Sequence, residues 1–158
     1  MKLVIYKKND FKPEELAEWL WTLCEEAYEY GSPWTKSQFL VDILQPHTDY
    51  YVLVENSIIQ GFLSYPSVMD ETEVTNLAVA KAMQHKGCAR ALLRVLLDEE
   101  KKAGTYTVFL EVRLSNTPAR KLYESEKFRM LAKRKAYYHD PVEDAIIMST
   151  KLKTETIK

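Results

Sequence analysis

The sequence is poor in cysteine and histidine. Two cysteines, Cys24 and Cys88, are too few for a disulfide framework or for a zinc site built from cysteine. The three histidines, His47, His85 and His139, are scattered along the chain and lack the spacing of metal ligands. We therefore expect a reduced, cytoplasmic setting and no bound metal.

The sequence also lacks a long apolar run and an excess of one charge. No apolar segment approaches the roughly 20 residues needed to cross a membrane, and the first ten residues resemble a strand more than a signal peptide. The chain has 22 basic and 23 acidic residues, which gives a formal net charge of -1. We therefore expect neither a membrane protein nor a nucleic-acid binder that relies on overall charge.

What is present fits one globular domain. Of the 158 residues, 46% are hydrophobic, which is enough for a sizeable core. No repeat, low-complexity tract or linker divides the chain, so we expect a single domain over 1–158, with a polar tail at about 151–158. We expect a monomer or a weak homodimer.

Hydrophobic periodicity predicts the secondary structure. Helices are expected at 13–30, between Thr35 and Pro46, at 89–103 and at 117–126. Strands are expected at 3–8, 50–55, 58–65, 71–79, 107–112, 128–138 and 145–152. Asn56-Ser57 predicts a hairpin turn, and Pro66 is expected to end the third strand.

The segment Asn76–Arg90 joins a predicted strand to a predicted helix through the polar loop Gln84–Ala89. The loop is either an ordinary turn or an anion site, because small residues let an anion reach the unpaired N–H groups of a helix start. It is not a Walker P-loop or a GxGxxG fingerprint. The basic residues nearby favour a diphosphate; they are His85, Lys86 and Arg90.

Glu111 interrupts the apolar segment 107–112. A buried carboxylate needs a partner, so one interpretation is a salt bridge with Arg113, Arg120 or a lysine. The other is a general base, because a partly desolvated carboxylate has a raised pKa and can accept a proton from an amine.

Other candidates each allow two interpretations. Tyr123 either packs within its helix or protonates a departing thiolate, and Asn116 either caps that helix or binds a ligand amide. Cys88 as a nucleophile is not favoured, because no histidine or acid is placed beside it by any recognisable pattern. The pair Tyr137-Tyr138 is either surface strand or the wall of a substrate groove.

Together these pieces resemble the GNAT acetyltransferase family. Its acetyl-CoA signature, Q/R-x-x-G-x-G/A between a strand and a helix, stands here at 84–89 as QHKGCA. Other segments resemble family members that acetylate the N-terminus of a ribosomal protein; these are NLAV at 76–79, LEVRLSN at 110–116, ARKLYES at 119–125, AYYHDPVEDAIIM at 136–148 and Pro33-Trp34-Thr35. The match covers most of the chain.

The resemblance implies an α/β (α+β) fold with a mixed, mostly antiparallel sheet of about seven strands, splayed in the middle, and about four flanking helices. It implies acetyl-CoA as co-substrate and no metal. Glu111 would be the general base and Tyr123 the general acid. Residues that would bind acetyl-CoA are Leu77, Ala78, Val79, Gln84, His85, Lys86, Gly87, Cys88, Ala89, Arg90 and Asn116.

The implied function is acetyl transfer to the N-terminal α-amine of a protein, namely a small-subunit ribosomal protein that begins with alanine. Two alternatives stay open. One is a family member that acetylates a lysine side chain or a small-molecule amine, and the other is a non-catalytic acyl-CoA-binding module. The presence of both Glu111 and Tyr123 favours an enzyme over a module.

The sequence departs from the family pattern at three places. Ala89 replaces the second glycine of the loop, which the pattern allows. No glycine precedes Phe128, so we expect a different local turn there. Ala136 stands where asparagine is frequent, within the expected peptide groove.

Overall fold

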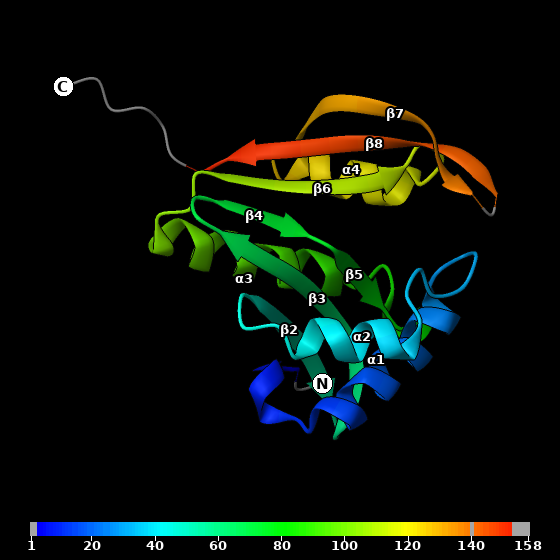
Figure 1. The fold of residues 1–158 in the computed structure, drawn as a ribbon, viewed down its shortest axis with the longest axis vertical. Coiled ribbons are helices and arrows are strands. Elements are labelled where there is room, and N and C mark those ends of the chain that lie inside the picture. The colour runs from blue at the N-terminus through cyan, green and yellow to red at the C-terminus, as the bar shows by residue number, and fades with distance from the viewer. Residues whose placement is uncertain (1–2, 140, 153–158) are drawn as a thin grey trace. The chain divides into compact units, whose positions relative to one another are not determined.

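The computed structural model describes residues 3–139 and 141–152, with helices and strands in the predicted order. The helices are α1 (Pro13–Ala27), α2 (Lys36–Ile43), α3 (Cys88–Ala103) and α4 (Thr117–Ser125). The strands are β1 (Val4–Lys7), β2 (Thr48–Glu55), β3 (Ile58–Val68), β4 (Glu71–Val74), β5 (Asn76–Val79), β6 (Thr107–Arg113), β7 (Arg129–His139) and β8 (Val142–Lys151). The chain forms two compact units (Figure 1). The first unit comprises residues up to 66 with 75–96, and the second comprises 67–74 and the residues from 97 onward.

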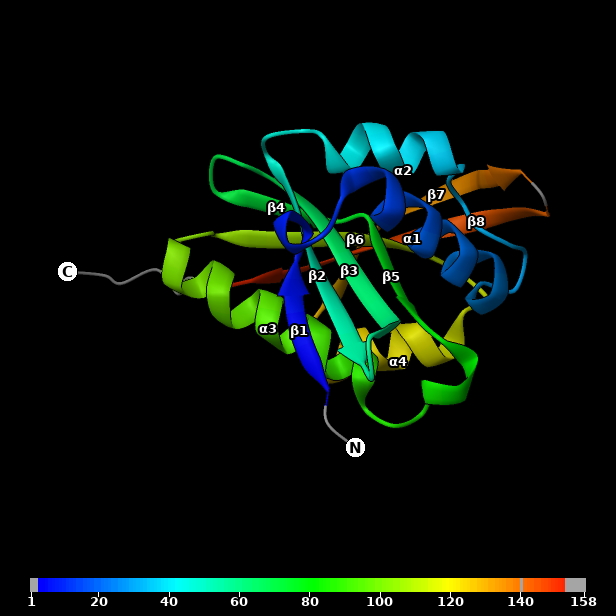
Figure 2. The same cartoon turned by 90° about the horizontal axis from the view of Figure 1, so that it is seen from below.

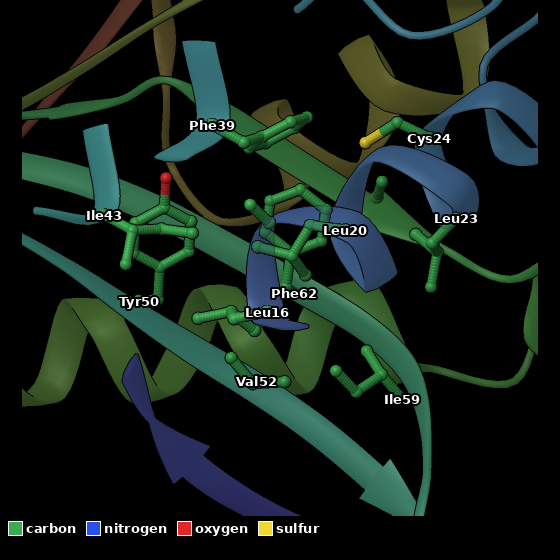
Figure 3. Packing of buried hydrophobic residues seen from close by; sticks show 12 residues of the cluster. Leu16, Leu20, Leu23, Cys24, Phe39, Ile43, Tyr50, Val52, Ile59 and Phe62 are labelled. Carbon is green, nitrogen blue, oxygen red and sulfur yellow. The ribbon is translucent and has the colours of Figure 1, made fainter. Parts of the chain in front are cut away.

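The first unit is built on an antiparallel sheet in which β1 pairs β2, β2 pairs β3, and β3 pairs β5. Helices α1 and α2 cover one face of this sheet (Figure 2). Leu16 and Leu20 of α1, Phe39 of α2, and Tyr50 and Phe62 of the strands are all fully buried in one cluster (Figure 3). This core holds β5 in place, because the side chain of Ala78 belongs to the same cluster.

The second unit is built on β4, β6, β8 and β7, in that order. β4 pairs β6 in parallel, and the pairs β6–β8 and β8–β7 are antiparallel. The buried face carries Val108 and Leu110 of β6 and Met148 of β8. The carboxylate of Glu100, at the end of α3, is also buried and accepts hydrogen bonds from the hydroxyls of Thr72 and Ser67. These bonds satisfy a carboxylate that burial would otherwise penalise.

The prediction of a single strand at 71–79 is wrong, because two strands with different partners form there. β4 pairs β6 in parallel, whereas β5 pairs β3 in antiparallel fashion. Thr75 stands between the two strands, and both its backbone N–H and its hydroxyl donate to the carbonyl oxygen of Ser64, at 2.9 and 3.1 Å. Because of this break, the part of the chain that the structure describes has eight strands, where about seven were predicted.

Pro66 does not end β3, contrary to the prediction. Its Cα partner is Thr48, the first residue of β2, and the next two residues of β3 pair instead with β4. A proline is tolerated where a ladder changes partner, since fewer N–H donors are needed there.

The predicted hairpin turn is confirmed. Asn56 and Ser57 have φ angles of 51° and 63°, which suit a tight hairpin turn. Thr35 caps α2 by accepting a hydrogen bond from the backbone N–H of Gln38 at 3.1 Å. α1 ends at Ala27, three residues before the predicted end, and β8 begins at Val142 instead of at residue 145. Most of the predicted polar tail lies outside the described residues.

No helix within residues 3–139 and 141–152 is both long and apolar enough to span a membrane.

Candidate active site

The loop before α3 is open and has an unusual backbone. His85 and Gly87 have φ angles of 62° and 82°, in the left-handed region that glycine adopts easily. A Cβ placed on Gly87 would meet no atom within 4 Å. The backbone N–H of Ala91 donates to the carbonyl oxygen of Gly87 at 2.9 Å, which is the first i to i−4 hydrogen bond of the helix. The N–H groups of the three residues before Ala91 lie in the first turn, ahead of this bond. Such donors at a helix start suit an anion.

Gln84 anchors this loop to β5. Its side-chain amide donates to the carbonyl oxygen of Val79 at 3.0 Å. The hydroxyl of Tyr28 donates to the carbonyl oxygen of Leu77 at 3.4 Å. The pairings of the described strands join β5 to β3 alone, so the first unit brings Leu77–Val79 and the loop together at one sheet edge.

The remaining loop residues differ in exposure. His85 and Lys86 are exposed, while Ala89 and Arg90 are half-buried. Cys88 is 3% exposed, and burial raises the pKa of its thiol. A covered, protonated thiol is a poor nucleophile, which agrees with the sequence interpretation. No group of three or more potential metal ligands is found in the part of the chain that the structure describes.

Glu111 points away from the buried face of β6. Its side chain is 25% exposed, and one carboxylate oxygen lies 3.6 Å from the guanidinium of Arg134 on β7. The salt-bridge interpretation therefore holds, but with a different arginine from those predicted. Arg113 instead pairs with Glu143 at 3.3 Å, and Arg120 donates to the carbonyl oxygen of Leu114 at 2.9 Å.

Three tyrosines accompany Glu111 in the second unit. Tyr137 donates a hydrogen bond to Glu111, and this bond is the main reason that the pKa of Tyr137 is raised. Desolvation, followed by the charge of Glu111, raises the pKa of Tyr138 to about 12. Tyr123 is 7% exposed, and its pKa is raised mainly by desolvation, with Tyr138 adding to the effect. All three phenols therefore hold their protons near neutral pH.

Sequence reasoning missed two residues of this cluster, Glu73 and Arg134. Glu73 pairs with Phe109 across the parallel ladder, which places it on the same face as Glu111. Desolvation and the charge of Glu111 raise the pKa of Glu73, against the opposing effect of Arg134. The alternation in 71–74 hinted at an outward Glu73, but its neighbours follow only from the strand pairing.

Asn116 caps α4, because its side-chain oxygen accepts a hydrogen bond from the N–H of Ala119 at 3.3 Å. The capping interpretation is confirmed, and a contact with a ligand stays a prediction. At the other end of α4, Lys127 has a φ of 70°. The lysine therefore takes up the left-handed conformation that the missing glycine would have supplied, so the expectation of a different turn before Phe128 is wrong.

Comparison with known proteins decides the family. The model of the acetyltransferase (GNAT) family matches residues 13–128. The chain belongs to the GNAT acetyltransferase family. This membership confirms the predicted fold, which has eight strands and four α-helices within the described residues, and makes the chain an N-acetyltransferase.

Several proteins similar to this chain share one name. The ribosomal protein bS18-alanine N-acetyltransferase of Escherichia coli is 37% identical over 126 residues, 78% of this chain and 84% of that protein. Its Haemophilus ducreyi counterpart is 37% identical over 120 residues, 74% of this chain and 82% of that protein. The crystal structure of the Escherichia coli ribosomal-protein-S18-alanine N-acetyltransferase gives a TM-score of 0.87 at 30% identity, covering 98% of this chain and 97% of that one.

Proposed function

We propose that this GNAT enzyme transfers the acetyl group of acetyl-CoA to the N-terminal α-amine of a protein, with a ribosomal protein that begins with alanine as the acceptor. The observation that carries the proposal is the similarity to the Escherichia coli enzyme, which extends over 98% of this chain at a TM-score of 0.87. The relatives named above carry bS18-alanine acetylation in their names.

The first unit offers residues that fit the co-substrate. The open space at Gly87, the exposed Lys86 and the start of α3 suit a pyrophosphate. The backbone of Leu77–Val79 would pair with the pantetheine arm. Acetyl-CoA supplies a thioester, whose acyl carbon the amine attacks.

The second unit offers the groups that move protons. An α-amine has a pKa of about 8 and is largely protonated near neutral pH, so a base must first take a proton from it. Glu111, half-buried and reachable from solvent, would act as this base. As the carbon–nitrogen bond forms, negative charge grows on the carbonyl oxygen, and backbone N–H groups of β5 would stabilise it.

Tyr123 would complete the reaction. When the carbon–sulfur bond breaks, the departing thiolate needs a proton, and the phenol of Tyr123 is held in its protonated form by burial. Its ring packs against Phe128 with centroids 5.9 Å apart, which fixes its position.

The acceptor class is tested with four substrates of matched concentration: an alanine-initiated peptide, the same peptide with a blocked N-terminus and one internal lysine, free lysine, and a polyamine. We expect the free N-terminal peptide to be acetylated fastest, with the product mass and its fragments placing the acetyl group on the α-amine. Faster acetylation of the internal lysine or of the polyamine would refute the proposed acceptor. Tight CoA binding without turnover on any substrate would refute the enzyme and favour the binding module.

The base role of Glu111 is tested by Glu111→Gln. We expect kcat to fall about 10²-fold or more while the affinity for acetyl-CoA is retained, because a general base typically contributes about 10²–10⁴ in rate. Glu124→Gln, a change at an exposed position of α4, is the matched control and should leave kcat unchanged. Unchanged turnover in Glu111→Gln would exclude the base role.

A further inference from the structure

The guanidinium of Arg134 lies beside a carboxylate and an aromatic ring, which are groups that attract cations. Its guanidinium is 3.6 Å from a carboxylate oxygen of Glu111 and 5.2 Å from the centroid of the Tyr137 ring. Glu73 lies on the same face of the sheet as Glu111, because it pairs with Phe109, two residues before Glu111 on β6, and the charges of Glu111 and Arg134 both act on its carboxyl. Two carboxylates and an aromatic face are the groups that bind an alkylammonium ion.

The strand register explains how Arg134 reaches Glu111. Glu111 pairs with Ile147 of β8, while Arg134 pairs with Ala145, the next residue of β8 on the same face. Arg134 must therefore extend diagonally across β8. The small side chain of Ala145 leaves room for a long side chain on that path.

The contact holds Arg134 only weakly. Its side chain is 54% exposed, against 25% for Glu111, so more than half of the Arg134 side chain is already in contact with water. Exposed ion pairs contribute little, because both partners are well solvated when apart.

We propose that Arg134 occupies, in the substrate-free enzyme, the place that the acceptor's ammonium group takes beside Glu111, and that acceptor binding displaces it. This inference rests on the proposed function, since it names the cation that competes with Arg134. Arg134 is thus a positioning residue that competes for the base. It favours acceptors that bring a positive charge of their own.

Competition predicts a change in the acceptor KM with no change in kcat. If Arg134 holds Glu111 for part of the time, the apparent affinity for the acceptor is reduced by the fraction of enzyme that is free. For an exposed pair this fraction corresponds to a factor of about two to five. Arg134→Gln should therefore lower the KM for the free N-terminal peptide about two- to five-fold, leaving kcat and the KM for acetyl-CoA unchanged.

Two further variants separate competition from a general charge effect. Arg129→Gln removes a positive charge from the same exposed strand and should leave the peptide KM unchanged. Arg134→Lys keeps a cation of similar reach and should retain the parent KM. A higher peptide KM in Arg134→Gln, an unchanged one, or the same fall in Arg129→Gln would overturn the proposal.

A second measurement needs no turnover. The Nε–Hε signal of Arg134, assigned by its absence in Arg134→Gln, is followed by NMR while butylammonium chloride is added, with sodium chloride at equal concentration as reference. We expect butylammonium to shift the signal more than sodium does, and Glu111→Gln to abolish the difference. Equal shifts with both salts would overturn displacement.

The two measurements tell the failures apart. If the parent enzyme does not acetylate the peptide but butylammonium displaces Arg134, the proposed acceptor is wrong and the cation site stands. If the peptide is acetylated and neither the peptide KM nor the NMR signal responds as expected, the proposed function stands and the displacement of Arg134 is wrong.

Discussion

The proposed reaction depends on a single hydroxyl group, that of Tyr123, as the proton donor. Removing it in Tyr123→Phe leaves the ring contact with Phe128 in place, so the fold should be retained. We expect kcat to fall about 10²-fold, because the leaving thiolate loses its proton donor, with little change in the KM for acetyl-CoA. Steady-state kinetics measure both, and Tyr106→Phe serves as control. A kcat equal to that of the control would assign Tyr123 to packing alone.

Lys127 pays a conformational cost that glycine would avoid. Its φ of 70° closes α4, where the N–H of Phe128 bonds the carbonyl of Tyr123 at 2.9 Å and that of Lys127 bonds Glu124 at 3.0 Å. Lys127→Gly should raise the free energy of unfolding by about 1 kcal/mol, since a non-glycine residue is disfavoured in this region. Urea unfolding measures the gain. Glu124→Gly, inside the helix, should instead lose about 1 kcal/mol; a loss in both variants would contradict the argument.

Among the elements, α3 is the one whose start should bind the pyrophosphate. Gly87→Asp and Gly87→Asn impose nearly the same shape and backbone strain, and only the first adds a negative charge. We expect acetyl-CoA to bind Gly87→Asp about tenfold or more weakly than Gly87→Asn, because like charges repel at close range. Calorimetric titration at low and high salt checks this, and the difference should shrink with salt. Equal affinities would place the pyrophosphate elsewhere.

The elements themselves were largely predictable because their signals are local. The stripe of leucines in α3 and the prolines in the first turns of α1 and α4 act within a few residues. The break at Thr75 was not predictable, because it depends on Ser64, eleven positions away, and on a change of strand partner. The change of parity between Val74 and Leu77 is a weak local sign of a break, but it does not say which strands the two halves pair with.

At the scale of the whole molecule, stability should depend on pH through Glu143. Hydrogen bonds from Ser115, followed by the ion pair with Arg113, lower the pKa of this carboxyl below its ordinary value of 4.5. A lowered folded-state pKa stabilises the fold above pH 4.5, and this contribution is lost as the pH falls through the folded value.

The variant Glu143→Gln removes that contribution. We expect its thermal midpoint to lie below that of the parent at pH 7, and the gap to narrow as the pH falls below about 4.5. Calorimetry at several pH values between 3 and about 7 measures the gap. A gap of constant size across this range would show that the charge of Glu143 does not matter.

The candidate site was predictable only in part. The resemblance to the GNAT family pointed to Glu111, Tyr123 and the loop before α3, because each lies in a short segment that resembles a segment of the family. Glu73 and Arg134 were not predicted. Glu73 comes close to Glu111 through the parallel pairing of β4 with β6, and Arg134 reaches Glu111 across the intervening strand β8. The register between strands that are distant in sequence depends on the folded sheet and cannot be predicted from any single segment.

The outermost strand of the second unit has a consequence for how copies of the chain behave in solution. β7 has only β8 as a described partner and exposes Met130 and Leu131, which are 65% and 62% accessible. Such an edge could template aggregation with a second copy. The pairing of β7 with β8 is interrupted between Arg134 and Tyr138. The strand also carries four basic residues, which are Arg129, Lys133, Arg134 and Lys135. Repulsion between these charges and the irregular edge would keep neighbouring molecules from adding strand to strand, so the edge that carries the proposed cation site also guards the protein against fibrous association.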